Sequence, residues 1–545
     1  MDYNALAQLL FPETKLTRED MEQRFPKRTL PENACVTRIG PSPTGFVHLG
    51  NLYNAIIAER LAHQSCGVFY LRIEDTDNKR EVEGAVETII GSMAFYDVLF
   101  DEGATADGDN GDYGPYRQRK RKEIYHVFAK QLVERGLAYP CFLTEEELSA
   151  IREEQEKNKE NPGIYGKYAE KSRSLSIEQI KDNIAAGRPW VLRYRGVETD
   201  EYISVNDAIR GKLEMPRNNM DFVLLKSDGI PTYHFAHVVD DHLMRSTHVI
   251  RGDEWISSLP MHVELFNTFG WEMPIYCHTA TLQKLDNGSK RKLSKRKDPE
   301  LSLEYYQQEG FYQAAVWEFL LTILNSNFEE WRLANPDSNY LDFPFSLEKM
   351  SNSGALVDLD KLNNISKEVI GRMKPSEVYD KWLKWCEKYN ESFAELLKKY
   401  PERTINALNV GKSGNNPRKD ITSWKQACEF MSLYYDETFE IADEMPEEVD
   451  EATRKLFFEK YLASYDHSDD QSAWFEKVKQ ITAELNFAVK PKDYKKNPGQ
   501  YKGSIVHITN MLRIALTGHA NAPDIWEISH VLGEEITEKR LKQWK

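Results

Sequence analysis

The sequence predicts an α/β nucleotide-binding fold in the first part of the chain and an all-α domain in the last part. Near the start, a β-branched run at residues 36–39 is followed by a Pro- and Gly-rich turn and then by apolar residues at helical spacing. Strand-like runs return at about residue 221, and helical periodicity prevails beyond about residue 350. Because 545 residues are too many for one hydrophobic core, we expect roughly two to four domains.

The composition is that of a globular protein, with 41% hydrophobic and 29% charged residues. The net charge of −16 argues against indiscriminate binding to nucleic acid or anionic membranes, although a local basic groove can lie on an acidic body. The six cysteines form no CxxC and no Cys/His cluster, which predicts a reducing compartment and no metal site. No apolar run is long enough to span a bilayer and the N-terminus lacks the pattern of a secretory signal, so we expect a cytoplasmic protein.

The segment TRIGPSPTGFVHLGN, residues 37–51, places a helix N-terminus at the carboxyl end of a strand, where backbone N–H groups favour a polyanion. His48 can donate to a phosphate, and Gly50 lets a ligand approach the backbone. The alternative is an ordinary strand–turn–helix with a surface histidine, since the loop matches neither GxGxxG nor GxxxxGK[ST]. The segment KLSKR at residues 292–296 favours the first interpretation.

Together the two segments resemble the signatures of class I aminoacyl-tRNA synthetases. Residues 48–51, HLGN, resemble the HIGH motif with Asn51 at its last position, and residues 292–296 resemble the KMSKS motif. PSPTG at 41–45 and RIEDTD at 72–77 resemble bacterial-type glutamyl-tRNA synthetases in particular. The resemblance covers residues 34–545, densely in the catalytic half and less so in the anticodon half. It implies a Rossmann-like class I catalytic domain, an inserted acceptor-stem domain and an all-α anticodon-binding domain.

These signals divide the chain into six parts. In order, they are an N-terminal extension at 1–33, the first catalytic half at 34–115, the inserted acceptor-stem-binding domain at 116–220, the second catalytic half with the KMSKS-like loop at 221–350, a stem-contact linker at 351–375 and the helical anticodon-binding domain at 376–545. The extension reads as one short amphipathic helix packed on the main domain, and no function is assigned to it.

The second predicted strand starts at residue 68 and ends in the acids Glu74, Asp75 and Asp77, at the edge where open α/β sheets bind ligands. These acids could bind a metal, cap the next helix or pair with nearby basic residues. The resemblance assigns Glu74 to the α-amino group of the substrate.

Within the predicted insertion, Arg117, Arg119, Lys120 and Arg121 crowd the start of a helix. Such a charge run is commonly a solvated helix face, and the alternative is a set of phosphate contacts. The resemblance places tRNA binding here. Some relatives carry a zinc knuckle with several cysteines in this region, whereas this chain has only Cys141, so we predict no zinc.

The second catalytic half is expected to form strands at residues 222–226, 231–237, 247–252 and 276–282, with a turn at 228–229. The stretch PTYHFAHVVDDHLM…THVIRGDEW resembles the glutamyl family closely. The family residues at His237 and Trp255 often differ, which leaves the fine shape of the pocket open. The resemblance implies two sets of site residues. For glutamate they are Arg38, Gly40, Ser42, Glu74, Tyr233, His237 and Arg251; for ATP they are Thr44, Gly45, His48, Gly50, Asn51, Glu254, Trp255, Lys292, Leu293, Ser294 and Lys295.

His48, Lys292 and Lys295 are the expected catalytic residues, with Mg²⁺ sharing the phosphate charge. The basic loop at 284–298 is interpreted as a mobile loop that reaches the ATP phosphates, and the alternative is an exposed basic loop without function. Arg38 can bind a carboxylate in two-point fashion, and the resemblance assigns it the side-chain carboxylate of glutamate; the alternative is a structural ion pair with acids near Asp75.

The resemblance therefore implies ATP-dependent ligation of L-glutamate to tRNA(Glu) through a glutamyl-adenylate, by a monomer in which activation commonly waits for tRNA. Whether tRNA(Gln) is also charged, and which residues contact the anticodon, stay open. A glutaminyl-tRNA synthetase is disfavoured because that relative usually has PEPNG where this chain has PSPTG. A shortened paralogue and the small nucleotidylyltransferases lack the long helical tail. A non-catalytic RNA-binding scaffold is disfavoured by the intact His48, Lys292 and Lys295.

Overall fold

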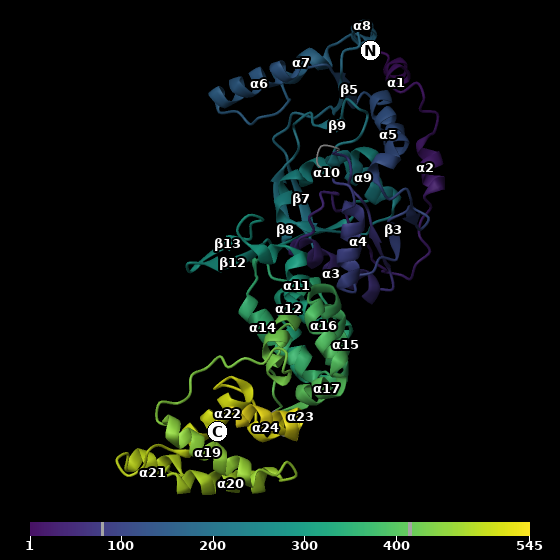
Figure 1. Cartoon of the computed structure of the whole chain (residues 1–545). Helices are drawn as coiled ribbons and strands as arrows, with labels where there is room; N and C mark the ends of the chain where they lie inside the picture. Colours follow the sequence, from purple (N-terminus) through teal and green to yellow (C-terminus); the bar gives the residue numbers. More distant parts are fainter. Residues whose placement is uncertain (78–80, 413–416) are drawn as a thin grey trace. The chain divides into compact units, whose positions relative to one another are not determined.

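A computed structural model describes residues 1–77, 81–412 and 417–545 (Figure 1). The chain divides into two compact units. The first comprises Met1–Tyr305 and Leu320–Asp358, and the second comprises Tyr306–Phe319 and Leu359–Lys545. The structure thus groups Tyr306–Phe319 with the helical unit, although the sequence analysis assigns these residues to the catalytic half.

The centre of the first unit is a mostly parallel sheet. The strands β1 (Val36–Ile39), β2 (Val68–Leu71) and β3 (Glu102–Ala104) pair in parallel, and β4 (Asp109–Asn110) adds an antiparallel edge. A second parallel pair, β10 (His248–Gly252) and β11 (Ile275–Thr279), lies beside β1, where the amide of Thr247 donates to the carbonyl of Val36 at 2.9 Å. All four residues of β1 are buried, as expected for a strand covered on both faces.

Helices cover this sheet. The helix α3 contacts β1, β2 and β10, and α9 contacts α5 and α10. Their bounds are α3 (Leu49–Gln64), α4 (Ala85–Phe95), α5 (Lys122–Glu134), α9 (Tyr233–Leu243) and α10 (Leu259–Phe269). The predicted strand at 36–39 and the helix that follows it are confirmed as β1 and α3.

The predicted strand at 231–237 is wrong, because these residues begin α9. Thr232 is extended at the N-cap, and residues 235–241 are all buried, as expected for a helix enclosed by its neighbours rather than for a strand with alternating exposure. The Gly229 turn forms, but only Pro231 returns to pair, in a single bridge with Leu225 of β9 (Val223–Leu225). The predicted strand at 276–282 is divided between β11 and β12 (Leu282–Asp286).

The predicted insertion contributes to a three-stranded sheet in the order β5 (Ala138–Cys141), β6 (Val191–Tyr194), β9, so it shares that sheet with the returning catalytic half. In Figure 1, α6 and α7 extend outward from this sheet. The other elements are α6 (Glu145–Asn158), α7 (Lys167–Arg173), α8 (Ile177–Ala185) and the hairpin of β7 (Tyr202–Asp207) and β8 (Gly211–Pro216). The hairpin contacts β11 through β7.

The N-terminal extension forms two helices rather than one, α1 (Tyr3–Leu10) and α2 (Arg18–Arg24). α1 buries Leu6, Ala7 and Leu10 and contacts α5. The Glu22 carboxylate of α2 lies 2.7 Å from both His242 and Arg245, so the extension is part of the catalytic unit.

The KMSKS-like loop follows a hairpin of β12 and β13 (Ser289–Lys292). β12 also pairs in parallel with β14 (Ala355–Leu356). The next helices along the chain are α11 (Leu303–Glu309), α12 (Gln313–Leu324) and α13 (Phe328–Ala334); the first two are divided between the units, and α13 lies in the first unit.

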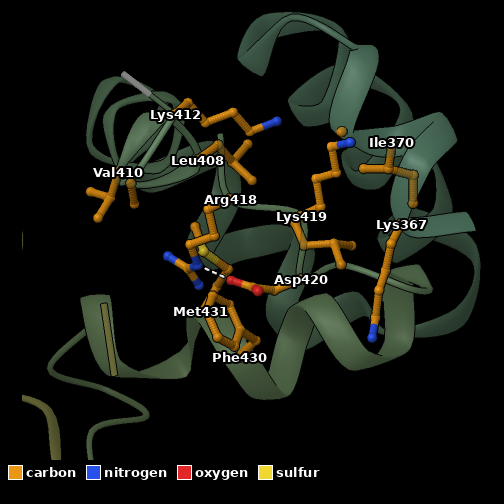
Figure 2. Close-up of a pocket in the computed structure, with 13 residues that line it drawn as sticks. Lys367, Ile370, Leu408, Val410, Lys412, Arg418, Lys419, Asp420, Phe430 and Met431 are labelled. Carbon is orange, nitrogen blue, oxygen red and sulfur yellow. Dashed lines mark hydrogen bonds and ion pairs between the residues drawn. The ribbon is translucent and has the colours of Figure 1, made fainter. Parts of the chain in front are cut away.

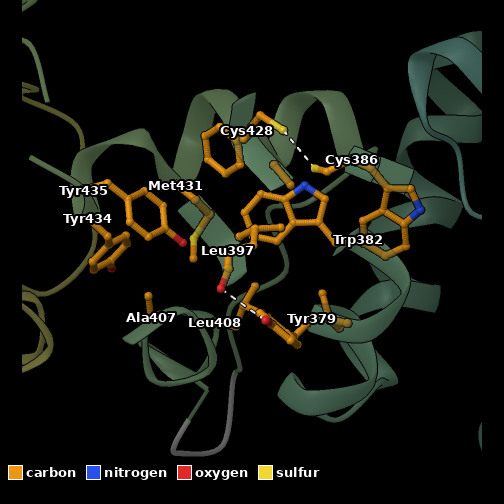
Figure 3. Packing of buried hydrophobic residues seen from close by; sticks show 14 of the residues in the cluster. Tyr379, Trp382, Cys386, Leu397, Ala407, Leu408, Cys428, Met431, Tyr434 and Tyr435 are labelled. Carbon is orange, nitrogen blue, oxygen red and sulfur yellow. Dashed lines mark hydrogen bonds between the residues drawn. The ribbon is translucent and has the colours of Figure 1, made fainter. Parts of the chain in front are cut away.

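The second unit is helical, from α14 (Leu359–Arg372) to α24 (Glu534–Lys542). Its first core packs Trp382, Leu397 and Tyr435, and the Cys386 and Cys428 thiols lie 3.8 Å apart within it (Figure 3). The intervening helices are α15 (Pro375–Tyr389), α16 (Glu391–Lys399), α17 (Pro401–Asn409), α18 (Trp424–Met431), α19 (Glu451–Ser464), α20 (Gln471–Glu484), α21 (Pro491–Lys496), α22 (Ile505–Thr517) and α23 (Ile525–Leu532). Among the helices of the described residues, none is both long and apolar enough to cross a bilayer.

Candidate active site

A cavity of about 450 Å³ opens at the carboxyl ends of β1, β2 and β10, where ligands of open α/β sheets bind. An adjoining cavity of about 180 Å³ shares His48, Asn54, Gly252 and Glu254 with it and reaches Lys292. The first cavity contains most of the sequence-predicted residues for glutamate and ATP. They are Arg38, Gly40, Ser42, Thr44, His48, Asn51, Glu74, Tyr233, Arg251, Glu254 and Trp255.

The smaller cavity of about 30 Å³ in the second unit is lined by Lys367, Lys412, Arg418 and Lys419 among apolar side chains (Figure 2). Its volume is about that of one or two water molecules, so it does not admit a nucleotide. Arg418 already pairs with Asp420. We therefore build the candidate active site in the first unit.

His48 is the N-cap of α3. Its Nδ1 accepts the Asn51 amide at 3.2 Å, and the Asn51 side chain accepts the His48 amide at 3.0 Å. Since Nδ1 is an acceptor, the proton of the neutral ring lies on Nε2, which is thus a donor. Burial lowers the pKa of His48, and the nearby Lys292 and Lys295 lower it further, although Glu254 opposes them. The backbone amide of residue 51 therefore fixes the tautomer of His48, and the side chain of Asn51, the departure from the HIGH motif, accepts the His48 amide.

At two positions of the site, close neighbours leave room only for glycine. A Cβ on Gly40 would lie 2.3 Å from the Glu74 carboxylate, and a Cβ on Gly252 would lie 2.1 Å from that of Glu254. Neither distance is compatible with van der Waals contact, so larger residues would displace the two acids. Gly45 has a φ of +73°, in the left-handed region that glycine favours.

Arg38 is 3% exposed, and its Nε and Nη2 each donate to the Asp241 carboxylate at 3.0 Å. The expected structural alternative, a pair with acids near Asp75, is therefore replaced by a pair with Asp241. Arg38 still lines the cavity, and no described residue accepts a hydrogen bond from its Nη1. The Nη1 edge is thus left for a ligand.

Asp241 also receives Arg72 Nη1 at 2.7 Å, and Arg72 Nη2 donates to Glu74 at 2.9 Å. Burial alone would raise the pKa of Asp241, but Arg38 and Arg72 hold it well below its usual range. Burial raises the pKa of Glu74 against the opposing charges of both arginines. The hydrogen-bonded network of Arg38, Asp241 and Arg72 therefore holds the Glu74 carboxylate in a fixed position at the cavity.

Arg251 ends β10 and lines the same cavity. Its Nη1 donates to the Tyr233 hydroxyl at 3.2 Å. His237 lies behind Tyr233, with the two rings stacked at 5.7 Å, and its Nδ1 is 2.5 Å from Asp241. Burial lowers the pKa of His237 to about 3, so the ring is neutral. His237 is fully buried and is absent from the residues that line the cavity, so it supports Tyr233 rather than facing a ligand.

The KMSKS-like loop is tied to the β12–β13 hairpin by Asp298. This carboxylate accepts from Arg291 at 2.6 and 2.8 Å and from the Ser294 amide at 2.8 Å. Lys292 and Lys295 are exposed, and the Lys295 ammonium lies 3.9 Å from the centre of the Phe46 ring. The loop thus holds both lysines beside His48. Leu293 is buried and lines the second cavity.

The basic run at 117–121 differs from an exposed cluster. The Arg121 guanidinium is fully buried and lies 2.7 Å from Asp240, so it is not available to RNA. Arg117 donates to the carbonyls of Gly108 and Thr105, and Arg119 donates to Asp75. Lys120 is the exposed member of the run.

Several supporting residues were not identified from the sequence. Asp241 and Tyr276 surround His237, and Asp207, His262 and His278 surround Arg251. Asp240 and Asp241 fall within the stretch that resembles the glutamyl family, whereas Asp207 and His278 carry no local signal. Among the described residues, no group of three or more His, Cys, Asp or Glu side chains could hold a metal ion.

Comparisons with known proteins agree with this geometry. The family model for the catalytic domain of class I tRNA synthetases for E and Q matches residues 34–363, and the model for an anticodon binding domain matches 393–545. A glutamate–tRNA ligase of Acetivibrio thermocellus is 54% identical over 545 residues, with 100% of both chains covered. One of Clostridium perfringens (strain SM101) is 46% identical over 550 residues, again with 100% of both covered.

The crystal structure of a glutamate tRNA ligase from Elizabethkingia meningosepticum in complex with its amino acid matches with a TM-score of 0.74 and 26% identity, over 94% of this chain and 99% of that one. The full-length matches, the α/β unit with its two signature segments and the helical second unit agree with one another. The chain therefore belongs to the glutamate–tRNA ligase family of class I aminoacyl-tRNA synthetases.

Proposed function

We propose that this chain ligates L-glutamate to tRNA(Glu) in two steps at the cavity of the first unit. The observation that carries the proposal is the cavity in which the guanidinium groups of Arg38 and Arg251 and the carboxylate of Glu74 lie beside His48, with Asp77 and Glu254 also in its wall. The two guanidinium groups and the Glu74 carboxylate complement the two carboxylates and the ammonium of free glutamate. Arg38 Nη1 takes the side-chain carboxylate, and Glu74 takes the α-amino group.

In the first step the α-carboxylate of glutamate attacks the α-phosphorus of ATP, and pyrophosphate leaves. This chemistry requires alignment and charge neutralisation rather than a protein nucleophile. His48 donates from Nε2 to a phosphate oxygen, and Lys292 and Lys295 neutralise the charge that develops as pyrophosphate leaves. In the second step a ribose hydroxyl of the terminal adenosine of the tRNA attacks the mixed anhydride.

Mg²⁺ fits the site because this ion is usually held by one or two carboxylates together with substrate phosphates. Glu254 lines both cavities next to His48 and is the carboxylate placed to hold it. When bound, the ion would neutralise phosphate charge. We propose no zinc, since the thiol of Cys141 is buried and the Ser172 hydroxyl contacts it at 3.4 Å.

For tRNA, we propose that the exposed Lys120 contacts the backbone. In the second unit, an open cavity of about 570 Å³ lies between α20 and α22, lined by Trp474, Phe475 and Arg513. Aromatic faces with a nearby cation suit an unstacked base, so this cavity is our candidate for an anticodon nucleotide. Charging of tRNA(Gln) as well is a second candidate activity, and assays with both purified tRNAs decide it.

The test of the first step is Lys295→Ala. We expect ATP–pyrophosphate exchange with tRNA present to fall by about tenfold or more, because one contact that strengthens in the transition state is lost. Lys297→Ala is the matched control, since this lysine is also exposed in the same loop, whereas it is the Lys295 ammonium that lies over the ring of Phe46, a residue of the cavity wall. Unchanged exchange in Lys295→Ala would refute the role of the loop.

A further inference from the structure

Arg251 is held on three sides by neutral side chains. Its Nε donates to Nε2 of His278 at 2.9 Å, and its Nη1 donates to Nδ1 of His262 and to the Tyr233 hydroxyl, each at 3.2 Å. Its Nη2 lies 3.4 Å from the Trp255 carbonyl. Arg251 itself is 6% exposed and reaches the cavity, whereas His278 is fully buried and absent from the cavity wall.

The direction of these hydrogen bonds is fixed by arginine, which only donates. Because Arg251 occupies Nε2 of His278 as a donor, the ring proton of His278 lies on Nδ1. That nitrogen is 2.7 Å from Asp207 Oδ2, which accepts it. Asp207 is in turn fixed by the backbone amides of Ile209 and Arg210, which donate to its other oxygen at 2.9 and 2.8 Å.

The same argument applies on the other side of the guanidinium. Nδ1 of His262 must be an acceptor, so its proton lies on Nε2, 3.1 Å from Nδ1 of His234. Burial lowers the pKa of His278 and that of His262, and the positive charge of Arg251 lowers both further. Neither ring therefore competes with Arg251 as a donor near neutral pH.

We propose that Asp207 and His278 are positioning residues for amino-acid recognition, which hold the Arg251 guanidinium in the orientation that binds a carboxylate of the substrate. This inference rests on the proposed glutamate site. The two residues come from β7 and β11, which contact each other, and β11 pairs in parallel with β10, the strand that carries Arg251. Neither touches the substrate. Asp207 fixes the tautomer of His278, and that tautomer alone presents a lone pair to Arg251 Nε.

Substitutions of His278 can keep its hydrogen bond with Arg251 or its hydrogen bond with Asp207 separately. In glutamine the amide oxygen takes the place of Nε2, so His278→Gln keeps an acceptor for Arg251. In asparagine the amide takes the place of Nδ1, so His278→Asn keeps only a partner for Asp207. Asp207→Asn places an amide opposite Nδ1, which favours the tautomer with the proton on Nε2, and that proton opposes the Nε proton of Arg251.

The experiment measures KM for glutamate and for ATP by ATP–pyrophosphate exchange with tRNA present, using the full chain. We expect His278→Asn and Asp207→Asn to raise the KM for glutamate about tenfold or more and to leave the KM for ATP within about twofold, as expected for a lost substrate contact. His278→Gln should stay within about threefold of the unsubstituted protein for both substrates.

Equal KM values for glutamate in His278→Asn and His278→Gln, or a parallel rise in both KM values, would overturn the proposal. If His278→Asn does not fold, as judged by its melting temperature, Asp207→Asn gives the same decision. Failure of the proposed function looks different, because the unsubstituted protein would then show no glutamate-dependent exchange at all.

Discussion

At the scale of single residues, burial determines which protonation states the catalytic unit can use. His234, His237, His262 and His278 all lie around Tyr233 and Arg251, and each is neutral. Burial is the first cause in each case and lowers the pKa of His234 to about 4 and that of His237 to about 3. Arg251 adds to this effect, whereas Asp241 and Asp207 oppose it at His237 and His278.

These pKa values predict how the stability of the first unit depends on pH. A histidine whose folded pKa lies below its unfolded value of about 6.5 stabilises the fold above that pH, and its contribution is lost as the pH falls below it. We expect His234 and His237 each to reduce the free energy of unfolding by about 1 kcal/mol between pH 7.5 and 5.5, and His262 and His278 to act in the same direction. Urea unfolding of the unsubstituted protein across this range measures the sum.

The control for this prediction is His234→Asn, which removes one titrating group. It should lower the slope of unfolding free energy against pH by the equivalent of about one proton, whatever it does to absolute stability. The prediction fails if stability is flat from pH 7.5 to 5.5, or if the slope is unchanged in the variant.

A second prediction concerns Phe46, which the sequence analysis did not select. The Lys295 ammonium lies 3.9 Å from the centre of its ring, and a cation–π contact at an exposed site contributes about 0.5–1 kcal/mol. Phe46→Leu should therefore raise the KM for ATP about two- to fivefold, since Lys295 is no longer held beside the cavity. Phe46→Tyr keeps the ring and should match the unsubstituted protein. Equal KM values in the two variants would show that the contact does not position Lys295.

At the scale of elements, the KMSKS-like loop depends on the hairpin β12–β13 and on Asp298, which is 2% exposed. Asp298 accepts hydrogen bonds from Arg291 and Ser294, and Lys284 lies 3.3 Å from it. Arg291 and Lys284 hold the pKa of Asp298 well below its usual range. A single buried carboxylate thus joins the base of the hairpin to the loop that carries the two catalytic lysines.

Asp298→Ala should therefore release this loop. We expect tryptic cleavage within residues 284–297 to accelerate about tenfold or more, because the loss of a buried charged acceptor lowers the free energy of local opening by about 1.5 kcal/mol or more. Mass spectrometry of the first fragments identifies the site. Asp286→Ala is the matched control, since Asp286 also pairs with Arg291 but its side chain is 43% exposed. Equal cleavage rates in the two variants would contradict the role of Asp298.

Elements whose pattern is local were predictable from sequence. β1, β2 and β10 are short, mostly buried runs that contain β-branched or aromatic residues, and apolar residues recur at helical spacing in α3, so each has a signal within a few residues. The first half of α9 was predicted as part of a strand because the hairpin turn signal at 228–229 precedes it, whereas its burial against α5 and α10 is a property of the tertiary structure. This packing, rather than the local turn signal, determined the structure of the segment.

The residues of the site also fall into two groups, those with a signal in the sequence and those that only the fold brings together. Residues of the two signature segments and of the 231–255 stretch could be assigned because they resemble a family, and most of them line the larger cavity or the one that adjoins it. Asp207 and His278 could not, since the hydrogen bond between them joins positions 71 residues apart in the chain. Arg121 was expected at the surface, but it forms a buried ion pair with Asp240. The two residues are brought together only by the packing of α5 against α9.

At the scale of the whole molecule, a net charge of −16 must be reconciled with a polyanionic substrate. The basic run at 117–121 supplies less exposed charge than its sequence suggests, because Arg121 is buried. In the second unit, α21 and its N-cap expose Lys490, Lys492, Lys495 and Lys496. This basic cluster was not among the residues predicted to bind tRNA, and it lies in the segment matched by the anticodon-binding model.

We therefore expect tRNA affinity to fall steeply with salt despite the acidic total. Each phosphate contact contributes a slope of roughly 0.7–0.9 in a plot of log affinity against log salt, so the double variant Lys495→Ala/Lys496→Ala should lower the slope by about 1–2. Filter binding of tRNA(Glu) between about 50 and 200 mM salt measures it.

The control is Lys455→Ala/Lys539→Ala, because these exposed lysines of the same unit already pair with Glu451 and Asp436. A flat response in the unsubstituted protein would mean that neither Lys120 nor the α21 cluster touches RNA. A slope that falls equally in both double variants would mean that general charge, rather than the α21 cluster, draws the tRNA to the second unit.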